Sequence, residues 1–218
     1  MAEIAFAPDA AFDYPPVRLQ GSLSPAPPES PRQPTSLIEE PFHAGLEQWI
    51  GDTAGWQLDA AGARPAGLAL LQPSLELDDY DFEFFARIET RGLTFVFRAS
   101  NFSNYQKAGL ALTESGGYEL RRTVVIGGVE EPGPAVALRT PARSGAAFTI
   151  KTRARRNDFT IWFDGEQVAH WSDGRLPTGG IGFTAARNTK ARIYWVKLAP
   201  LDGPHTEAAP RRLPRSIS

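Results

Sequence analysis

The stretch that decides the fold is residues 158–199, DFTIWFDGEQVAHWSDGRLPTGGIGFTAARNTKARIYWVKLA. In its first segment, FTIWFD (159–164), every second residue is bulky and apolar, which is typical of a β-strand with one buried face. Asp164-Gly165 follows, a pair that tolerates the positive φ angles of a tight hairpin turn. Residues 167–171 therefore form the predicted return strand.

Two further strands are expected in the same stretch, at 181–183 and 191–198, where apolar, β-branched and aromatic residues gather. A pair of strands cannot bury its apolar face alone. We therefore expect a second sheet to cover Phe159, Phe163, Ile181 and Phe183.

The remaining chain supplies short strand patterns separated by turn residues and no long helical pattern. The expected strands are 41–56 (with a turn), 66–72, 78–89, 94–100, 105–112, 118–126, 135–138 and 148–155. In 94–100 the alternation places Phe95, Phe97 and Ala99 on the inner face. This pattern predicts an all-β fold, a two-sheet antiparallel jelly-roll sandwich.

Two segments carry a family resemblance: the run from 159 to 198 and DYDFEFFARIETRGLTFVFRASNFSNYQ (79–106). Together they resemble the concanavalin A-like lectin and glucanase sandwich superfamily, specifically laminin-G-like and 3-keto-disaccharide-hydrolase-type bacterial domains. The resemblance covers roughly residues 40 to 199 and implies the sandwich fold. Because that superfamily includes lectins, glucanases and inert adhesion modules, it does not select a function.

Proline content divides the chain into three parts. Residues 1–41 hold nine of the nineteen prolines, and six acids against two bases give this segment a charge of −4. We interpret 1–41 as an extended proline-rich arm, 42–199 as the sandwich domain and 200–218 as a short extended tail.

Composition limits the partners and the location. The formal charge of −2 gives no argument for nucleic acid, and no apolar run approaches the ~20 residues of a membrane span. The N-terminus lacks the basic residues of a secretory signal, so a cytoplasmic protein is the default expectation, with a place at the periphery of a membrane complex left open. There is no cysteine, and no cofactor is expected.

Catalytic motifs are missing from the sequence. The Glu-x-Asp-x-x-Glu string of laminarinase-type relatives is absent, as are His-Glu-x-x-His, Gly-x-Ser-x-Gly and the P-loop pattern. The nearest acidic group is Asp79, Asp81 and Glu83 on one strand face, which is either a solvated face or a polar patch in a sugar groove. We predict no catalytic residue and no metal site.

Side chains suited to a sugar are aromatic rings that can stack, with amides and charges nearby for the hydroxyls. The ligand-binding candidates are Asp81, Glu83, Arg98, Asn101, Asn104, Tyr105, Trp162 and Trp171. The alternative is that the tryptophans pack under loops.

Docking candidates fall into two groups. The apolar residues of the arm are Phe6, Phe12, Tyr14, Val17 and Leu19, and the basic face of 148–155 is Lys151, Arg153 and Arg155. A restricted, extended arm loses little entropy on binding. The basic face fits an acidic partner or a membrane headgroup layer, or it protects an edge strand from aggregation.

Two functions survive these arguments. The first is a non-catalytic structural or interaction module that docks through its arms onto protein partners in a larger assembly. The second is a carbohydrate-binding domain or glycoside-processing enzyme that uses the outward aromatic and acidic face of the sandwich. The missing catalytic motifs favour the first.

Overall fold

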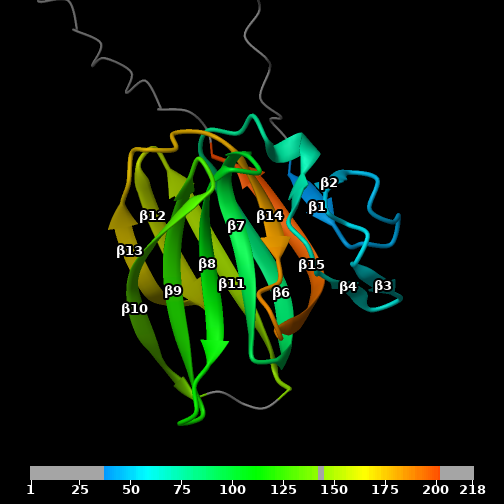
Figure 1. Ribbon diagram of the computed structural model, residues 1–218, viewed down its shortest axis with the longest axis vertical. Helices are drawn as coiled ribbons and strands as arrows, with labels where there is room; N and C mark the ends of the chain where they lie inside the picture. Colours follow the sequence, from blue (N-terminus) through cyan, green and yellow to red (C-terminus); the bar gives the residue numbers. More distant parts are fainter. Residues whose placement is uncertain (1–36, 142–144, 202–218) are drawn as a thin grey trace, which may run out of the picture. The chain divides into compact units, whose positions relative to one another are not determined.

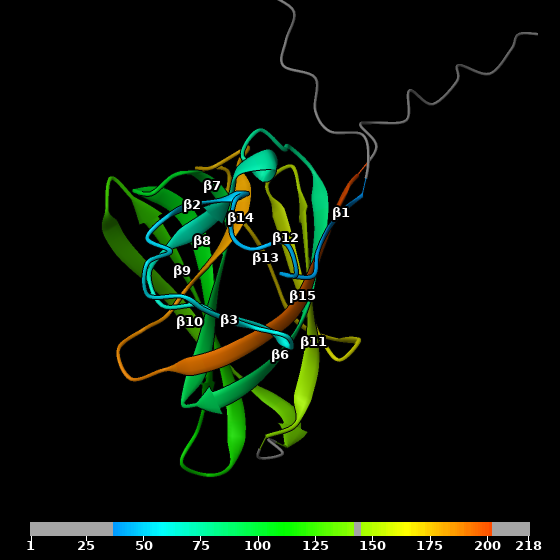
Figure 2. The same cartoon turned by 90° about the vertical axis from the view of Figure 1, so that its right-hand side faces the viewer.

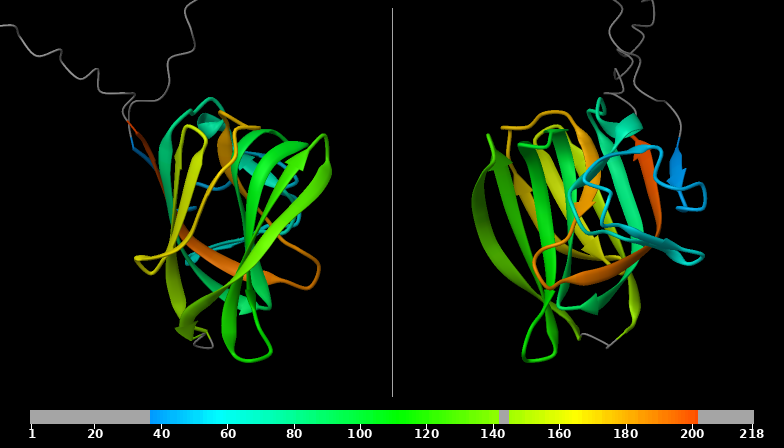
Figure 3. Two further views of the ribbon diagram at one scale, coloured as in Figure 1. Left: turned by 90° about the vertical axis from the view of Figure 1, so that its left-hand side faces the viewer. Right: turned by 45° about the vertical axis from the view of Figure 1, so that its right-hand side comes forward.

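The computed structural model describes residues 37–141 and 145–201. These residues form two antiparallel β-sheets packed face to face, which confirms the predicted all-β sandwich (Figures 1 and 3). We call the eight-stranded sheet, in the order β13-β12-β11-β6-β15-β4-β3 with β1 beside β15, sheet A. The seven-stranded sheet, in the order β10-β9-β8-β7-β14-β5-β2, is sheet B.

The strands of sheet A come from both ends of the described chain. They are β1 (Ile38–Glu40), β3 (Gln57–Asp59), β4 (Gly62–Arg64), β6 (Tyr80–Thr90), β11 (Ala147–Arg155), β12 (Asp158–Phe163), β13 (Glu166–Ser172) and β15 (Lys190–Pro200).

The strands of sheet B come mainly from the middle of the chain. They are β2 (Trp49–Gly51), β5 (Ala69–Leu71), β7 (Gly92–Asn101), β8 (Asn104–Leu112), β9 (Gly117–Ile126), β10 (Val129–Pro141) and β14 (Gly180–Thr184). A 3-10 turn, Gln72–Ser74, follows β5.

The predicted hairpin is present. Asp164 and Gly165 have φ angles of 47° and 84°, and β12 pairs antiparallel with β13 on either side of them. Two consecutive positive φ angles suit the right-handed twist of the flanking strands, which explains the choice of Asp-Gly.

The expectation that Ile181 and Phe183 share a sheet with Phe159 and Phe163 is wrong. β14 pairs with β5 and β7 in sheet B, whereas β12 lies in sheet A. The loop between β13 and β14 is long enough to cross from one sheet to the other. Ile181 and Phe183 therefore belong to the second sheet, which covers Phe159 and Phe163.

Aromatic rings from the two sheets meet in the core. Phe84 of β6 contacts Phe95 and Phe183 with ring centroids 5.1 Å apart in both cases, in edge-on geometry. All three side chains are fully buried. Burial of a phenylalanine side chain stabilises a fold by about 2–3 kcal/mol, so this layer is a major stabilising contact between the sheets.

A bulge in β7 overturns the predicted alternation beyond Phe97. Arg98 has a φ of 52°, and the register of β7 against β8 shifts between Phe97 and Asn101. Ala99 therefore packs with Leu70 and Val96, apart from the cluster that contains Phe95 and Phe97. A bulge adds one residue to one strand, which reverses the facing of every residue after it.

The sandwich begins earlier than predicted. β1 lies in the segment assigned to the arm, yet it pairs with residues 196–198 of β15 (Figure 2). Glu40 is buried, and its carboxylate accepts hydrogen bonds from the backbone NH of Phe42 (2.6 Å) and from the indole NH of Trp49 (3.3 Å). The sandwich therefore includes residues 38–40, which were assigned to the arm from the sequence.

Three-residue strands account for the poor sequence prediction of 41–72. The hairpin of β3 and β4 was not predicted, and β2 and β5 occupy only parts of the expected strands.

In the ranges that the structure describes, no helix has the length and apolar character needed to cross a bilayer.

Candidate functional site

The predicted ligand-binding residues do not converge on one site. The structure separates them into an outer face of sheet A, a hairpin tip and the core. The arm residues Phe6, Phe12, Tyr14, Val17 and Leu19 lie outside the described residues.

On the outer face of sheet A, Asp81 lies between two cations. Its carboxylate contacts Arg153 Nε (2.7 Å) and Lys151 Nζ (2.9 Å). Burial alone would raise the pKa of Asp81, but the hydrogen bonds from Arg153 and Lys151 outweigh it and hold the pKa below its ordinary value. The acidic candidate and two of the basic docking candidates are thus partners of one another.

The outward tryptophans of sheet A are also engaged within the chain. The guanidinium of Arg153 lies 5.8 Å from the ring centroid of Trp162, and the ammonium of Lys197 lies 5.4 Å from that of Trp195. Both rings are half-buried on the outer face of sheet A. Cations over these rings compete with a sugar for the same aromatic faces.

At the tip of the β7–β8 hairpin, the two asparagines hold loops in place. Asn101 Oδ1 accepts hydrogen bonds from Ser103 N (2.8 Å) and Asn104 Nδ2 (3.0 Å), and Asn104 Oδ1 accepts one from Gly127 N (2.8 Å). Tyr105 packs against the small apolar cluster outside sheet B. Glu83, like Asp81, lies on the outer face of sheet A, half-buried.

The structure corrects the predicted exposure of Arg98 and Trp171. Arg98 is fully buried, and Trp171 belongs to the main core, where it stacks on Phe159 with centroids 5.3 Å apart. The bulge at Arg98 turns its side chain inward. In the β12–β13 pair, the register shift between Ile161 and Trp162 places Trp171 opposite the inward-facing Phe159.

A groove of about 730 Å³ lies on the outer face of sheet B, over the ends of β7, β8 and β9. Its floor follows the pairing register, in which Thr94 lies opposite Gly109 and Gly109 opposite Arg121. The next row is Gly92, Ala111 and Glu119. Small outward side chains on the two central strands therefore leave the sheet surface low.

The glycines of the floor have different reasons to be there. A Cβ on Gly92 would lie 2.6 Å from the carbonyl oxygen of Leu110, so close backbone packing excludes any side chain. A Cβ on Gly109 would make ordinary contacts, at 3.7 Å from Thr94 Oγ1, so a side chain there would fill the groove without a clash. Glycine in a strand often marks a close approach by a ligand.

Charged side chains line the walls of the groove. Arg91 and Arg187 stand exposed, and neither has a carboxylate within 4 Å among the residues that the structure describes. Arg121 pairs weakly with Glu119 on its own strand, at 3.4 Å. None of the described lining residues is aromatic.

Sequence reasoning missed this groove because it searched for large side chains. The signal was present in residues 108–111, AGLA, a predicted strand whose outward positions 109 and 111 are small. The β14–β15 loop, which supplies Ala186, Arg187 and Thr189 to one wall, carries no such pattern. The described residues contain no group of three or more histidine, aspartate or glutamate side chains arranged to hold a metal ion.

Comparison with known proteins gives fold neighbours only. No family model matches the chain, and no curated protein matches it in sequence. The carbohydrate-binding module CBM66 from Bacillus subtilis matches 69% of this chain and 94% of its own with 19% identity and a TM-score of 0.58. The exoplasmic/lumenal domain of VIP36, in a Ca²⁺/Man3GlcNAc-bound form, matches 78% and 90% with 15% identity and a TM-score of 0.56.

The fold is a concanavalin A-like sandwich. The predicted fold is thereby confirmed. A third neighbour, the GH43B protein of the Bacteroides ovatus xyloglucan locus, matches 78% of this chain but only 40% of its own, with 11% identity and a TM-score of 0.54. Carbohydrate-binding and glycosidase proteins both occur among the neighbours, so the fold does not separate binding from catalysis.

Proposed function

We propose that this protein is a non-catalytic carbohydrate-binding domain whose sugar lies in the groove on sheet B. The observation that carries the proposal is the low floor at Thr94 and Gly109, which lies beside the exposed guanidinium groups of the walls. A volume of about 730 Å³ falls in the range of small-molecule sites. The neighbours that are carbohydrate-binding modules or lectin domains support the same reading.

We propose that the domain is non-catalytic because of the pKa values and ion pairs of its carboxylates. A glycosidase needs a general acid whose pKa is raised, paired with a second carboxylate at a defined separation. Asp81 has a lowered pKa and is held by Arg153 and Lys151, which suits a structural ion pair. In the groove, Glu119 contacts Arg121 at 3.4 Å.

The deciding experiment uses Gly109→Val, which places a side chain on the groove floor. Valine is favoured in strands, and a Cβ at this position meets only ordinary contacts, so the variant should fold. A glycan array with neutral and acidic sugars identifies a ligand, and calorimetry should then show at least a tenfold loss of affinity in Gly109→Val. Thr149→Val, on the outer face of sheet A, is the matched control and should bind like the wild type.

Two results would sink this proposal. One is a folded protein that binds no glycan on the array at millimolar concentration. The other is a ligand whose affinity is unchanged in Gly109→Val, because such a ligand does not occupy the groove.

Docking onto a larger assembly through the arm remains a second proposal. Of its basic face, Lys151 and Arg153 are neutralised in part by Asp81, whereas Arg155 is exposed and has no carboxylate within 4 Å among the described residues. Pull-downs from the native source should lose partners when residues 1–36 are removed and be weakened by Arg155→Glu. Equal recovery of partners by the full-length, truncated and substituted proteins would reduce the arm to a linker.

A further inference from the structure

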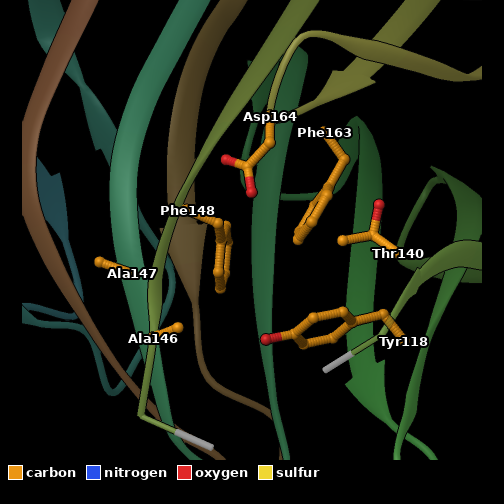
Figure 4. A pocket seen from close by; sticks show the side chains of 7 residues that line it. All are labelled: Tyr118, Thr140, Ala146, Ala147, Phe148, Phe163 and Asp164. Atoms are coloured by element: carbon orange, nitrogen blue, oxygen red, sulfur yellow. The ribbon is translucent and has the colours of Figure 1, made fainter. Parts of the chain in front are cut away.

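A second cavity, of about 290 Å³, opens between the two sheets at the end of the sandwich that holds the Asp164-Gly165 turn. Sheet B contributes Tyr118 and Thr140 to its lining, and sheet A contributes Phe148 and Phe163. Figure 4 shows these side chains and the carboxylate of Asp164 around one space. The cavity is separate from the groove, with which it shares no lining residue.

Three aromatic rings form the wall of this cavity. The ring centroids of Phe148 and Phe163 lie 5.1 Å apart, those of Tyr118 and Phe163 5.2 Å apart, and those of Tyr118 and Phe148 5.9 Å apart. All three side chains are buried, so their positions are fixed by the core. The faces of aromatic rings carry negative electrostatic potential, and a cluster of them attracts cations.

Among the described residues, Asp164 is the one charged side chain that lines the cavity. Its Oδ1 accepts a hydrogen bond from Thr149 N at 2.8 Å, which fixes the carboxylate at the mouth. No cationic side chain lies within 4 Å of it among the residues that the structure describes. Burial, and then the charge of Asp164, raise the pKa of Tyr118.

The chemistry of this lining selects one class of ligand. A metal ion such as Mg²⁺ or Ca²⁺ needs about six oxygen ligands, and the described side chains of this lining offer one carboxylate, one phenol and the hydroxyl of Thr140. A neutral apolar molecule would desolvate the carboxylate without compensating its charge. An alkylated ammonium group satisfies both the rings and the carboxylate.

We propose that the cavity lined by Tyr118, Phe148 and Phe163, with Asp164 at its mouth, binds a small organic cation of the substituted-ammonium class. The negative charge provides the attraction and the rings exclude water from the bound group. Because the cavity is built from both sheets, binding stabilises the folded state.

The test compares choline with 3,3-dimethyl-1-butanol, in which carbon replaces the charged nitrogen and the shape is preserved. The full-length protein is titrated with each compound, and binding is measured by calorimetry and by shifts of the Tyr118 ring resonances. We expect choline to bind on the order of tenfold more tightly than the neutral compound. Equal affinities would overturn the proposal, as would a folded protein that binds neither compound.

Asp164→Asn isolates the charge. Asparagine tolerates the positive φ angle of 47° before Gly165, and its amide oxygen can still accept the hydrogen bond from Thr149 N, so the hairpin should persist. We expect this variant to lose at least fivefold in choline affinity and to bind the neutral compound unchanged. Glu166→Gln removes an equal charge from an exposed neighbour outside the cavity and should bind choline like the wild type. Equal losses in the two variants would mean a general electrostatic effect and would contradict the site.

Discussion

The guanidinium of Arg98 in sheet B hydrogen-bonds the carboxylate of Asp79, which immediately precedes β6 of sheet A, with Nη2 and Oδ1 3.2 Å apart. The same Nη2 donates to the carbonyl oxygen of Arg156 at 2.9 Å, and the backbone NH of Arg98 donates to the hydroxyl of Tyr80 at 2.8 Å. Arg98 is fully buried, whereas the side chain of Asp79 is 20% exposed. One ion pair therefore ties the bulge of β7 to the opposite sheet.

The Arg98–Asp79 ion pair predicts that removing the anion alone lowers the free energy of unfolding more than removing both charges. Asp79→Asn leaves a buried guanidinium without its anion and should lower the free energy of unfolding by about 3 kcal/mol. The double variant Arg98→Met, Asp79→Asn should be more stable than Asp79→Asn alone, because no buried charge is left. Urea denaturation of the single and double variants measures the coupling, and simple additivity of the two effects would contradict it.

Two nitrogens of the buried Arg98 guanidinium are unpaired among the residues that the structure describes but lie near aromatic rings. Its Nε and Nη1 have no hydrogen-bond partner within the described chain, and the rings of Tyr80 and Phe159 lie 5.5 and 5.8 Å from its guanidinium carbon. Cation–π contact offsets part of the desolvation of the charge. Arg98→Lys should therefore be destabilising, because a lysine concentrates its charge in a strongly hydrated ammonium; thermal unfolding of the variant measures this, and an unchanged Tm would contradict it.

A second link between the sheets is sensitive to acid. Arg175 makes a bidentate contact with Asp173 (Nε–Oδ1 3.0 Å, Nη2–Oδ2 2.6 Å) and reaches Glu131 of β10 at 2.6 Å. The hydrogen bonds from the Arg175 side chain, partly opposed by burial, lower the pKa of Asp173 to about 2. A lowered folded-state pKa contributes stability above the unfolded pKa of about 4, and that contribution is lost as the pH falls toward 2.

The corresponding prediction concerns Asp173→Asn. At neutral pH the variant should be less stable than the wild type, and the difference should shrink steadily as the pH falls from about 4 to 2. Urea denaturation across this pH range provides the measurement. Asp52→Asn, a change at an exposed carboxylate outside any described ion pair, should show no such trend. A constant difference between wild type and Asp173→Asn would contradict the assigned pKa.

The long strands were predictable because their pattern is long. β6 alternates over eleven residues, and its inward residues, from Tyr80 to Ile88, are all buried as the sequence indicated. The same holds for the Asp164-Gly165 turn, since few residue pairs adopt two positive φ angles. Local chemistry sufficed in both cases.

The candidate site was not predictable in the same way. A groove arises from what side chains leave empty, and its walls come from β9 and from the β14–β15 loop, which are distant in sequence. The bulge at Arg98 lies within a continuous run of strand-forming residues, so the residues themselves gave no reason to interrupt the alternation. The misplacement of Ala99, Arg98 and Trp171 follows from such register shifts.

A single glycine tests how closely β4 is packed. Gly62 has a φ of 136°, and a Cβ there would lie 2.1 Å from the carbonyl oxygen of Ile193 in β15. Gly62→Ala should therefore destabilise the protein by more than 1 kcal/mol, through both the clash and the unfavourable φ. Gly116→Ala, where φ is also positive but nothing lies within 4 Å, isolates the backbone effect and should cost less in thermal unfolding. Equal costs would mean that the backbone at Gly62 can move away.

The start of the domain provides the last prediction. Residues 38–40 pair with β15, and the buried carboxylate of Glu40 holds the backbone of Phe42 and the indole of Trp49. A protein of residues 37–201 should keep the unfolding free energy of the full-length chain, whereas one of residues 42–199 loses this strand and exposes the edge of β15. We expect the shorter protein to be less stable by about 2 kcal/mol, from lost charge-assisted hydrogen bonds and lost apolar contact. Glu40→Gln in the longer protein should reproduce part of that loss in urea denaturation, because the carboxylate that accepts both hydrogen bonds is gone. If the two truncated proteins unfold at the same urea concentration, β1 contributes nothing and the domain begins after Pro41.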